Sequence, residues 1–232
     1  MVGESDSGSD FDFAVARCTS AGDLDTSFST DGKLLTDFSS DADYGYAVVV
    51  DSDDRIVVAG EGWNGSIPGL QAQDFAVARY TSAGVLDTSF STDGKLTTDI
   101  GSGNDYGRAV AVDSQDRVVV AGYSHNGSNN DFAVARYTSA GELDTTFSTD
   151  GKLTTAIGSG TDYGQAVAVD SNDRIVVAGY AWNDSNRDFA VVRHTSAGVL
   201  DAAFSSAFGA VDGMVMTPIC TYSDFGYAVA LD

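Results

Sequence analysis

Residues 107–157 read GRAVAVDSQDRVVVAGYSHNGSNNDFAVARYTSAGELDTTFSTDGKLTTAI, and this stretch decides the fold. It contains four short segments that alternate between apolar and polar residues or run apolar, and turn-forming residues bound each of them. We therefore expect strands at 107–113, 117–123, 131–137 and 152–157. The second segment is apolar enough to be buried on both faces, whereas the Thr-rich fourth segment suits an outer edge.

The whole chain repeats this pattern. The phrase Asp-Phe-Ala-Val begins at Asp12, Asp74, Asp131 and Asp188, so successive copies are 62, 57 and 57 residues apart. The five extra residues of the first interval lie at 67–71, in an expected loop. Four strands in each period of this length are typical of a β-propeller blade and not of a solenoid coil. One blade cannot bury both faces of its sheet, so neighbouring blades must stack.

The two ends of the chain lie at complementary points of the repeat. Residues 2–4 match the end of a second strand, and residues 227–232 match a first strand. We therefore expect an all-β propeller, with four blades of four antiparallel strands in a single domain over residues 1–232. Its blade units are approximately 45–100, 107–157 and 164–219, and a closing blade combines 226–232 with 1–38. The alternatives are half of an eight-bladed ring or a fragment of a longer propeller.

The string DFAVARYTSAGELDTTFSTDGKLTT at 131–155, followed by DYGQAVAVDSNDRIVVAGY at 162–180, resembles the delta-60 repeat. That resemblance covers practically the whole chain. It implies a β-propeller of a bacterial protein that is extracellular or on the cell surface, and it implies no catalytic residues. The last repeat departs from the pattern, with Met214 in place of Lys, an insertion at 207–211, and Pro218 and Cys220.

The charge of the chain is strongly negative. Thirty-four acidic residues face 12 Lys and Arg, which gives a formal net charge of −22. This balance excludes a nucleic-acid binder that neutralises phosphates, and it argues against docking on an anionic membrane. There is also no run of about 18 apolar residues, so we expect no insertion into a membrane.

One Asp precedes the expected first strand of every blade, and in a propeller this strand lines the central channel. Four carboxylates at one mouth of the channel would repel one another, and a hard cation such as Ca²⁺ would relieve that repulsion. The alternative is that each Asp caps its own turn. The candidate metal ligands are Asp43, Asp105, Asp162 and Asp224.

The loops between the second and third strands carry an aromatic or His residue followed by Asn. Exposed aromatic rings beside polar side chains can stack on sugars, although the same residues can also pack as a lid over the edge of the blade. The candidate ligand-binding residues are Trp63, Asn64, His125, Asn126, Trp182 and Asn183. Each Asn also begins an Asn-x-Ser sequence, which is an N-glycosylation acceptor in some secreted proteins.

The chain has two cysteines, Cys18 and Cys220. Both lie close to the expected closure of the propeller. A disulfide between them would remove unfolded-state entropy from a loop that spans almost the entire chain. The alternative is two unpaired thiols.

Signatures of catalysis are missing from the sequence. The only histidines are His125 and His194, which lie at different positions of the repeat, and no nucleophile, zinc or phosphate-loop motif occurs. We therefore expect a non-catalytic extracellular or cell-surface propeller for binding, adhesion or assembly, whose partner is a protein, a glycan or another copy. The alternative is a cation-dependent, lectin-like carbohydrate binder. A polysaccharide-acting enzyme is the least favoured function.

Overall fold

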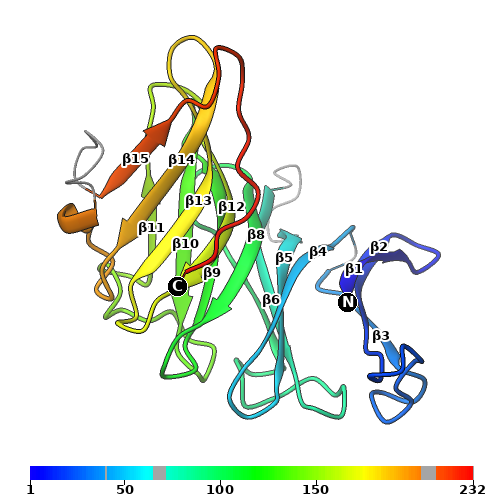
Figure 1. Ribbon diagram of the computed structural model, residues 1–232. Coiled ribbons are helices and arrows are strands. Elements are labelled where there is room, and N and C mark those ends of the chain that lie inside the picture. Colours follow the sequence, from blue (N-terminus) through cyan, green and yellow to red (C-terminus); the bar gives the residue numbers. More distant parts are fainter. Residues whose placement is uncertain (40, 65–71, 205–212, 232) are drawn as a thin grey trace.

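The structure is a computed structural model that describes residues 1–39, 41–64, 72–204 and 213–231 (Figure 1). This part of the chain forms four antiparallel sheets and one short 3-10 helix, η1 (Ala202–Phe204). The first sheet has three strands: β1 (Val2–Asp6), β2 (Phe11–Ala16) and β3 (Lys33–Thr36). In the described residues, no helix has the length and apolar character needed to cross a membrane.

The other three sheets have four strands each, in the chain order of one repeat. The second consists of β4 (Tyr44–Val50), β5 (Ile56–Asn64), β6 (Ala72–Tyr80) and β7 (Lys95–Thr98). The third consists of β8 (Asp105–Val112), β9 (Val118–His125), β10 (Asn130–Tyr137) and β11 (Lys152–Thr155). The fourth consists of β12 (Tyr163–Val169), β13 (Ile175–Trp182), β14 (Arg187–His194) and β15 (Met214–Thr217). These sheets confirm the all-β propeller fold and the four expected strands of the repeat.

An Asp holds the tight turn between the first and second strands of each four-stranded sheet. In the third sheet, Asp113 Oδ1 accepts hydrogen bonds from the backbone N–H of Gln115 at 2.9 Å and of Arg117 at 3.1 Å. Asp116 in the same turn has a φ of 55°, a conformation that Asp tolerates better than most residues. Many of the repeated Asp residues therefore stabilise turns.

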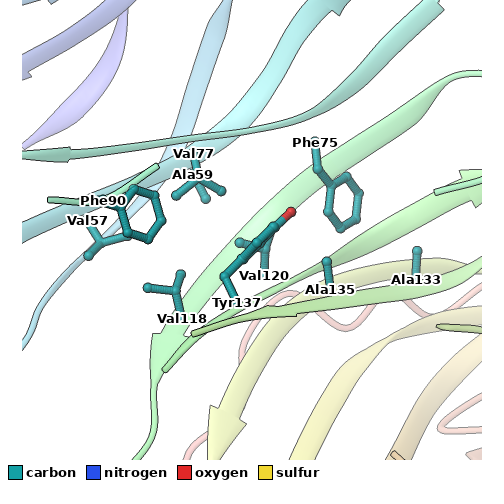
Figure 2. Close-up of a cluster of buried hydrophobic side chains, with 10 residues drawn as sticks. All are labelled: Val57, Ala59, Phe75, Val77, Phe90, Val118, Val120, Ala133, Ala135 and Tyr137. Carbon is teal, nitrogen blue, oxygen red and sulfur yellow. The ribbon is translucent and has the colours of Figure 1, made fainter. Parts of the chain in front are cut away.

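The sheets stack face to face in a row, with the first strand of one sheet against the inner strands of the sheet before it (Figure 1). A buried apolar cluster lies between the second and third sheets, as Figure 2 shows. It contains Val57, Ala59, Phe75, Val77, Phe90, Val118, Val120, Ala133, Ala135 and Tyr137. Similar clusters join the first sheet to the second and the third to the fourth. Burial of these apolar side chains is what drives the stacking.

Glycine permits the close approach of adjacent sheets. A Cβ atom on Gly107 would lie 2.5 Å from the carbonyl oxygen of Gly60, and one on Gly164 would lie 2.4 Å from that of Gly122. Both distances are too short for carbon and oxygen in contact. The Gly after Asp-Tyr is therefore required because the inner strands of neighbouring sheets meet backbone to backbone.

The expected closing blade is not formed. Residues 225–231 are not in a strand and do not pair with β1, which stays at the edge of its sheet. Instead, Gly226 lies against Gly179 of β13, where a Cβ atom would be 2.5 Å from the carbonyl oxygen. Each first strand packs on the sheet that precedes it, so residues 225–231 follow the fourth sheet while β1 packs on β4. The two complementary halves of a blade therefore lie at opposite ends of the row (Figure 1).

Candidate functional site

The Asp that precedes each first strand caps the turn between two sheets. Asp105 is fully buried, and its Oδ2 accepts hydrogen bonds from the backbone N–H of Ile100 at 2.6 Å and of Gly101 at 3.4 Å. Asp162 repeats this contact with Ile157 at 2.8 Å. Because both donors follow the fourth strand of the preceding sheet, the carboxylate joins two sheets. This is the capping role that the sequence left open as the alternative.

Burial controls the acidity of these carboxyl groups. It raises the pKa of Asp43 to about 6, and the nearby negative charge of Asp37 adds to this effect, whereas the backbone N–H groups of Phe38 and Trp63 oppose it. Burial likewise raises the pKa of Asp105 and of Asp162. Asp224 differs because it is only half buried, and the N–H of Ile219 lowers its pKa.

The structure does not bring the four predicted metal ligands together in one group. Asp43 and Asp105 instead lie near acidic residues of the preceding sheet. Two groups of three carboxylates result in the described part of the chain, and within each group one oxygen per residue lies within 4.8 Å of the others. We call Asp12, Asp37 and Asp43 group 1, and Asp74, Asp99 and Asp105 group 2. Asp43 and Asp105 therefore belong to different groups, and a ring of all four Asp residues stays a prediction.

The members of a group come from fixed positions of the repeat. Asp12 lies in β2, Asp37 follows β3 and Asp43 precedes β4, so group 1 spans the first and second sheets. Group 2 spans the second and third sheets in the same way. The later repeats keep two of the three carboxylates but have Ala156 and then Pro218 where Asp37 and Asp99 stand. Sequence reasoning missed these groups because their members are distant along the chain, although the register of the repeat could have revealed them.

A lysine of the following sheet lies beside each group. Lys95 Nζ donates to the backbone carbonyl of Asp37, and Lys152 Nζ donates to that of Asp99 at 2.5 Å. In the described part of the chain, neither lysine forms an ion pair of 4.0 Å or less with Asp12, Asp37, Asp43, Asp99 or Asp105. The ammonium groups therefore moderate the negative charge without taking up the carboxylate oxygens.

The predicted ligand-binding asparagines are bound within their own loops. Asn126 Nδ2 donates to Asn129 Oδ1 at 2.6 Å and to Asp131 Oδ2 at 2.7 Å. Asn183 makes the equivalent bonds to Asn186 at 2.7 Å and Asp188 at 2.6 Å. Both side chains hold the loop closed onto the third strand. The side chain of Asn64 lies outside the described residues.

The three ring-bearing residues of these loops lie on three different sheets. Trp63 is in β5, and the rings of His125 and Trp182 cover glycines: a Cβ atom would meet His125 at 3.0 Å on Gly103 and Trp182 at 2.6 Å on Gly160. Trp182 remains 36% exposed beside a hollow of about 220 Å³ that Arg187 also lines. His125 and Trp182 thus pack over glycines, and sugar binding at the three residues stays a prediction.

The expected disulfide is not formed, since both cysteines are free and exposed. Cys18 lies beyond β2 of the first sheet, whereas Cys220 follows β15 of the fourth. The Sγ atom of Cys220 donates instead to Asp224 Oδ1 at 3.3 Å. The two thiols do not meet because the first and fourth sheets, which carry them, lie at opposite ends of the row. The two halves of the closing blade are separated for the same reason.

A partly buried polar cluster breaks the symmetry of the repeat, and sequence reasoning did not identify it. Arg108 Nη2 donates to the hydroxyl of Tyr123 at 2.9 Å and lies 3.7 Å from Glu61 Oε2, with its guanidinium 4.1 Å from the centroid of the Tyr46 ring. The Tyr46 hydroxyl donates to Glu61 Oε1 at 3.0 Å. Burial raises the pKa of Glu61, and the positive charge of Arg108 opposes that rise. The cluster joins the second and third sheets as a compensated ion pair.

The family model described as a beta-propeller domain of unknown function (DUF5122) matches residues 52–90, 116–147 and 171–204. Each match starts in the turn after a first strand and runs through the second and third strands, so three successive repeats match at equivalent positions. The matches support a β-propeller repeat family. No curated protein matches the chain.

Proposed function

From this β-propeller repeat architecture we propose that the chain is a non-catalytic assembly module, in which the free edge of β1 receives residues 225–231 of a second copy. The observation that carries the proposal is that one blade is present as two unpaired halves. The first sheet has only three strands, and β1 is its edge. Residues 225–231 occupy the place of a first strand beyond the fourth sheet.

The backbone of β1 has donors and acceptors directed at the free edge. Met1 and Ala16 exchange backbone hydrogen bonds of 2.8 and 3.0 Å. Hydrogen-bonding direction alternates along an antiparallel strand, so Gly3 also faces β2, while Val2 and Glu4 direct their N–H and C=O groups outward. An edge of this kind is a template for another strand.

Apolar side chains of β4 are exposed to solvent, whereas the equivalent side chains of β8 are packed against a neighbouring sheet. Val48 is 40% exposed and Val50 is 53% exposed. In contrast, Val110 and Val112 at the same repeat positions of β8 pack against the core between the second and third sheets. A hollow of about 340 Å³ lies beside Val50. The uncovered residues are those that a first strand in the first sheet would contact.

A polar contact between neighbouring turns is also incomplete at this end. Ser52 donates to Asp116 of the third sheet, and Ser114 donates its N–H to Asp173 of the fourth sheet at 3.1 Å. Asp54 holds the equivalent position in the second sheet and is exposed. Within the part of the chain that the structure describes, no turn serine of a preceding sheet reaches it.

Residues 225–231 have the composition of the missing strand. Their sequence FGYAVAL matches YGYAVVV of β4, and Tyr227 is 68% exposed. In the second sheet Gly45 pairs with Gly60, and Val2-Gly3-Glu4 matches Ala59-Gly60-Glu61. The proposal therefore fixes the register of the joint, with Gly226 opposite Gly3 and Phe225 opposite Glu4.

The test is sedimentation of the purified chain over a range of concentrations in physiological salt, which screens repulsion between acidic copies. We expect masses at multiples of 24.0 kDa that increase with concentration. Glu4→Pro removes an outward-facing backbone donor at an exposed site, so it should abolish association while thermal unfolding stays cooperative. Glu4→Thr keeps the donor and is the matched control.

Two results would overturn the proposal. A monomer whose β1 amides exchange quickly with deuterium would show that the edge stays free. A monomer with protected β1 amides would show that the chain closes on itself and needs no second copy.

The proposed location of the module is outside the cell or on the cell surface. The resemblance to the delta-60 repeat supports this location, and so does the excess of 34 acidic over 12 basic residues, which suits water rich in salt.

A further inference from the structure

We infer that group 1 and group 2 are binding sites for a hard divalent cation, of which Ca²⁺ fits best, and that the ion joins two successive sheets. This inference goes beyond the proposed assembly and does not depend on it. Asp12, Asp37 and Asp43 form group 1, and their equivalents Asp74, Asp99 and Asp105 form group 2.

The geometry of each group matches a calcium ion. Ca²⁺ takes six to eight oxygen ligands at about 2.3–2.6 Å, so two ligands on opposite sides of the ion are at most about 5 Å apart. The carboxylate oxygens of each group lie within 4.8 Å of one another. One ion can therefore contact all three residues, while water completes its coordination. Mg²⁺ needs shorter distances and a stricter octahedron, so it fits less well.

An unsatisfied oxygen in each group needs a ligand. Asp12 is 5% exposed, and its Oδ1 has no hydrogen-bond partner among the described residues. In group 2 the same is true of Asp105 Oδ1, on a residue with no exposed surface. The hydroxyl of Ser124 is close enough to act as a donor to Asp105 and lowers its pKa, and neither this hydroxyl nor Asp105 Oδ1 has any other partner among the described residues. A buried polar atom without a partner is costly, and a cation would remove that cost.

A proton is the competing ligand. Burial raises the pKa of Asp12, and the neighbouring charge of Asp37 raises it further. Protonation of Asp12 would therefore compete with a cation for this carboxyl group, whereas Asp37 and Asp99 are exposed at the surface. The lysines beside the groups donate to the backbone carbonyls of Asp37 and Asp99.

The repeat supplies its own control. At the next junction, Asp131 and Asp162 are present but Ala156 replaces the exposed Asp. The lysine of the following sheet is replaced there by Met214. Asp131 Oδ1 at this junction also lacks a hydrogen-bond partner among the described residues, so the third carboxylate is what distinguishes groups 1 and 2 from it. With two carboxylates and no third, we expect this junction to bind no ion.

The test is titration of the chelator-treated, full-length chain with CaCl₂, with heat and stoichiometry as the readouts. We expect two ions for each chain, one for Asp37→Ala, and none for Asp37→Ala/Asp99→Ala, which copies the natural Ala156. Ala156→Asp should add a third ion. Ca²⁺ should also raise the melting temperature of the wild type but not of the double variant, since an ion that binds only the folded state stabilises it.

The inference fails if the wild type takes up no Ca²⁺ at millimolar concentration. It also fails if the double variant binds as many ions as the wild type, because the ions would then lie elsewhere on the acidic surface. Circular dichroism of each variant checks that it is folded, and substitutions at these exposed residues should change stability little.

Discussion

Arg136 Nη1 donates a hydrogen bond of 2.7 Å to the backbone carbonyl of Ser196, which belongs to the next sheet along the row. Its Nε donates to Asp144 Oδ2 at 2.9 Å, and its guanidinium lies 4.8 Å from the centroid of the Phe147 ring. Arg79 makes the equivalent contact with Ser139 at 2.6 Å. The buried arginine therefore ties the turn of one sheet to the turn of the next.

Arg136→Lys should destabilise the fold by about 2 kcal/mol, because lysine keeps the charge but cannot reproduce the directed hydrogen bonds of the guanidinium to both Ser196 and Asp144. Arg193→Lys is the matched control. Arg193 pairs with Asp201 at 2.8 Å, but no sheet follows to supply a carbonyl in the described residues. In urea unfolding, Arg193→Lys should lose less unfolding free energy than Arg136→Lys. Equal losses would contradict a clamp between sheets.

Gly164→Ala should cost about 3 kcal/mol of stability, because the added methyl group would meet the carbonyl of Gly122 and push two sheets apart. Gly3→Ala is the control, since nothing lies within 4 Å of a Cβ atom at that position. Both free energies come from denaturant unfolding. A loss for Gly164→Ala no larger than for Gly3→Ala would show that the inner strands have room to separate.

His194 makes the fold sensitive to acid. Its ring is buried, and burial lowers its pKa to about 4 from a normal value of 6.5. As the pH falls from 7 to 4, the unfolded chain gains a proton at this residue that the folded chain does not bind. The stability of the wild type should therefore fall over this range by on the order of 3 kcal/mol through this one group.

His194→Tyr should remove that contribution. Tyr137, at the same repeat position, donates its hydroxyl to Thr98 at 2.8 Å, and a new Tyr could reach Thr155, which now lies 3.1 Å from His194 Nε2. A hollow of about 280 Å³ beside His194 has room for the larger ring. The measurement is the difference in unfolding free energy between variant and wild type at pH 7 and pH 4. A difference that does not change with pH would contradict the assignment.

The local structure could be predicted from the sequence because the repeat makes each signal appear several times. Alternation and apolar runs give the strands, and Asp113 and its equivalents mark the turns. Gly107 and its equivalents mark the inner strand, although only the structure shows that the reason is contact between backbones.

Relationships between sheets could not be predicted in the same way. Asp12 and Asp43 are distant in the chain and meet only because the sheets stack, so the sequence indicated a ring of four carboxylates where the structure has groups of three. Arg108 and Glu61 lie at positions where other repeats have different residues. The sequence of either strand alone does not indicate that these two side chains meet. The positions of the two chain ends within the repeat indicated that they carry complementary parts of one blade. The sequence could not show whether these parts meet within one molecule.

The serial arrangement of the sheets has a mechanical consequence. If the molecule is pulled by its two ends, the whole load passes through every junction in turn, so the weakest junction fails first. The junction between the third and fourth sheets has Met214 in place of the lysine that the other two possess. Rupture under force should therefore begin there and shed the fourth sheet before the others.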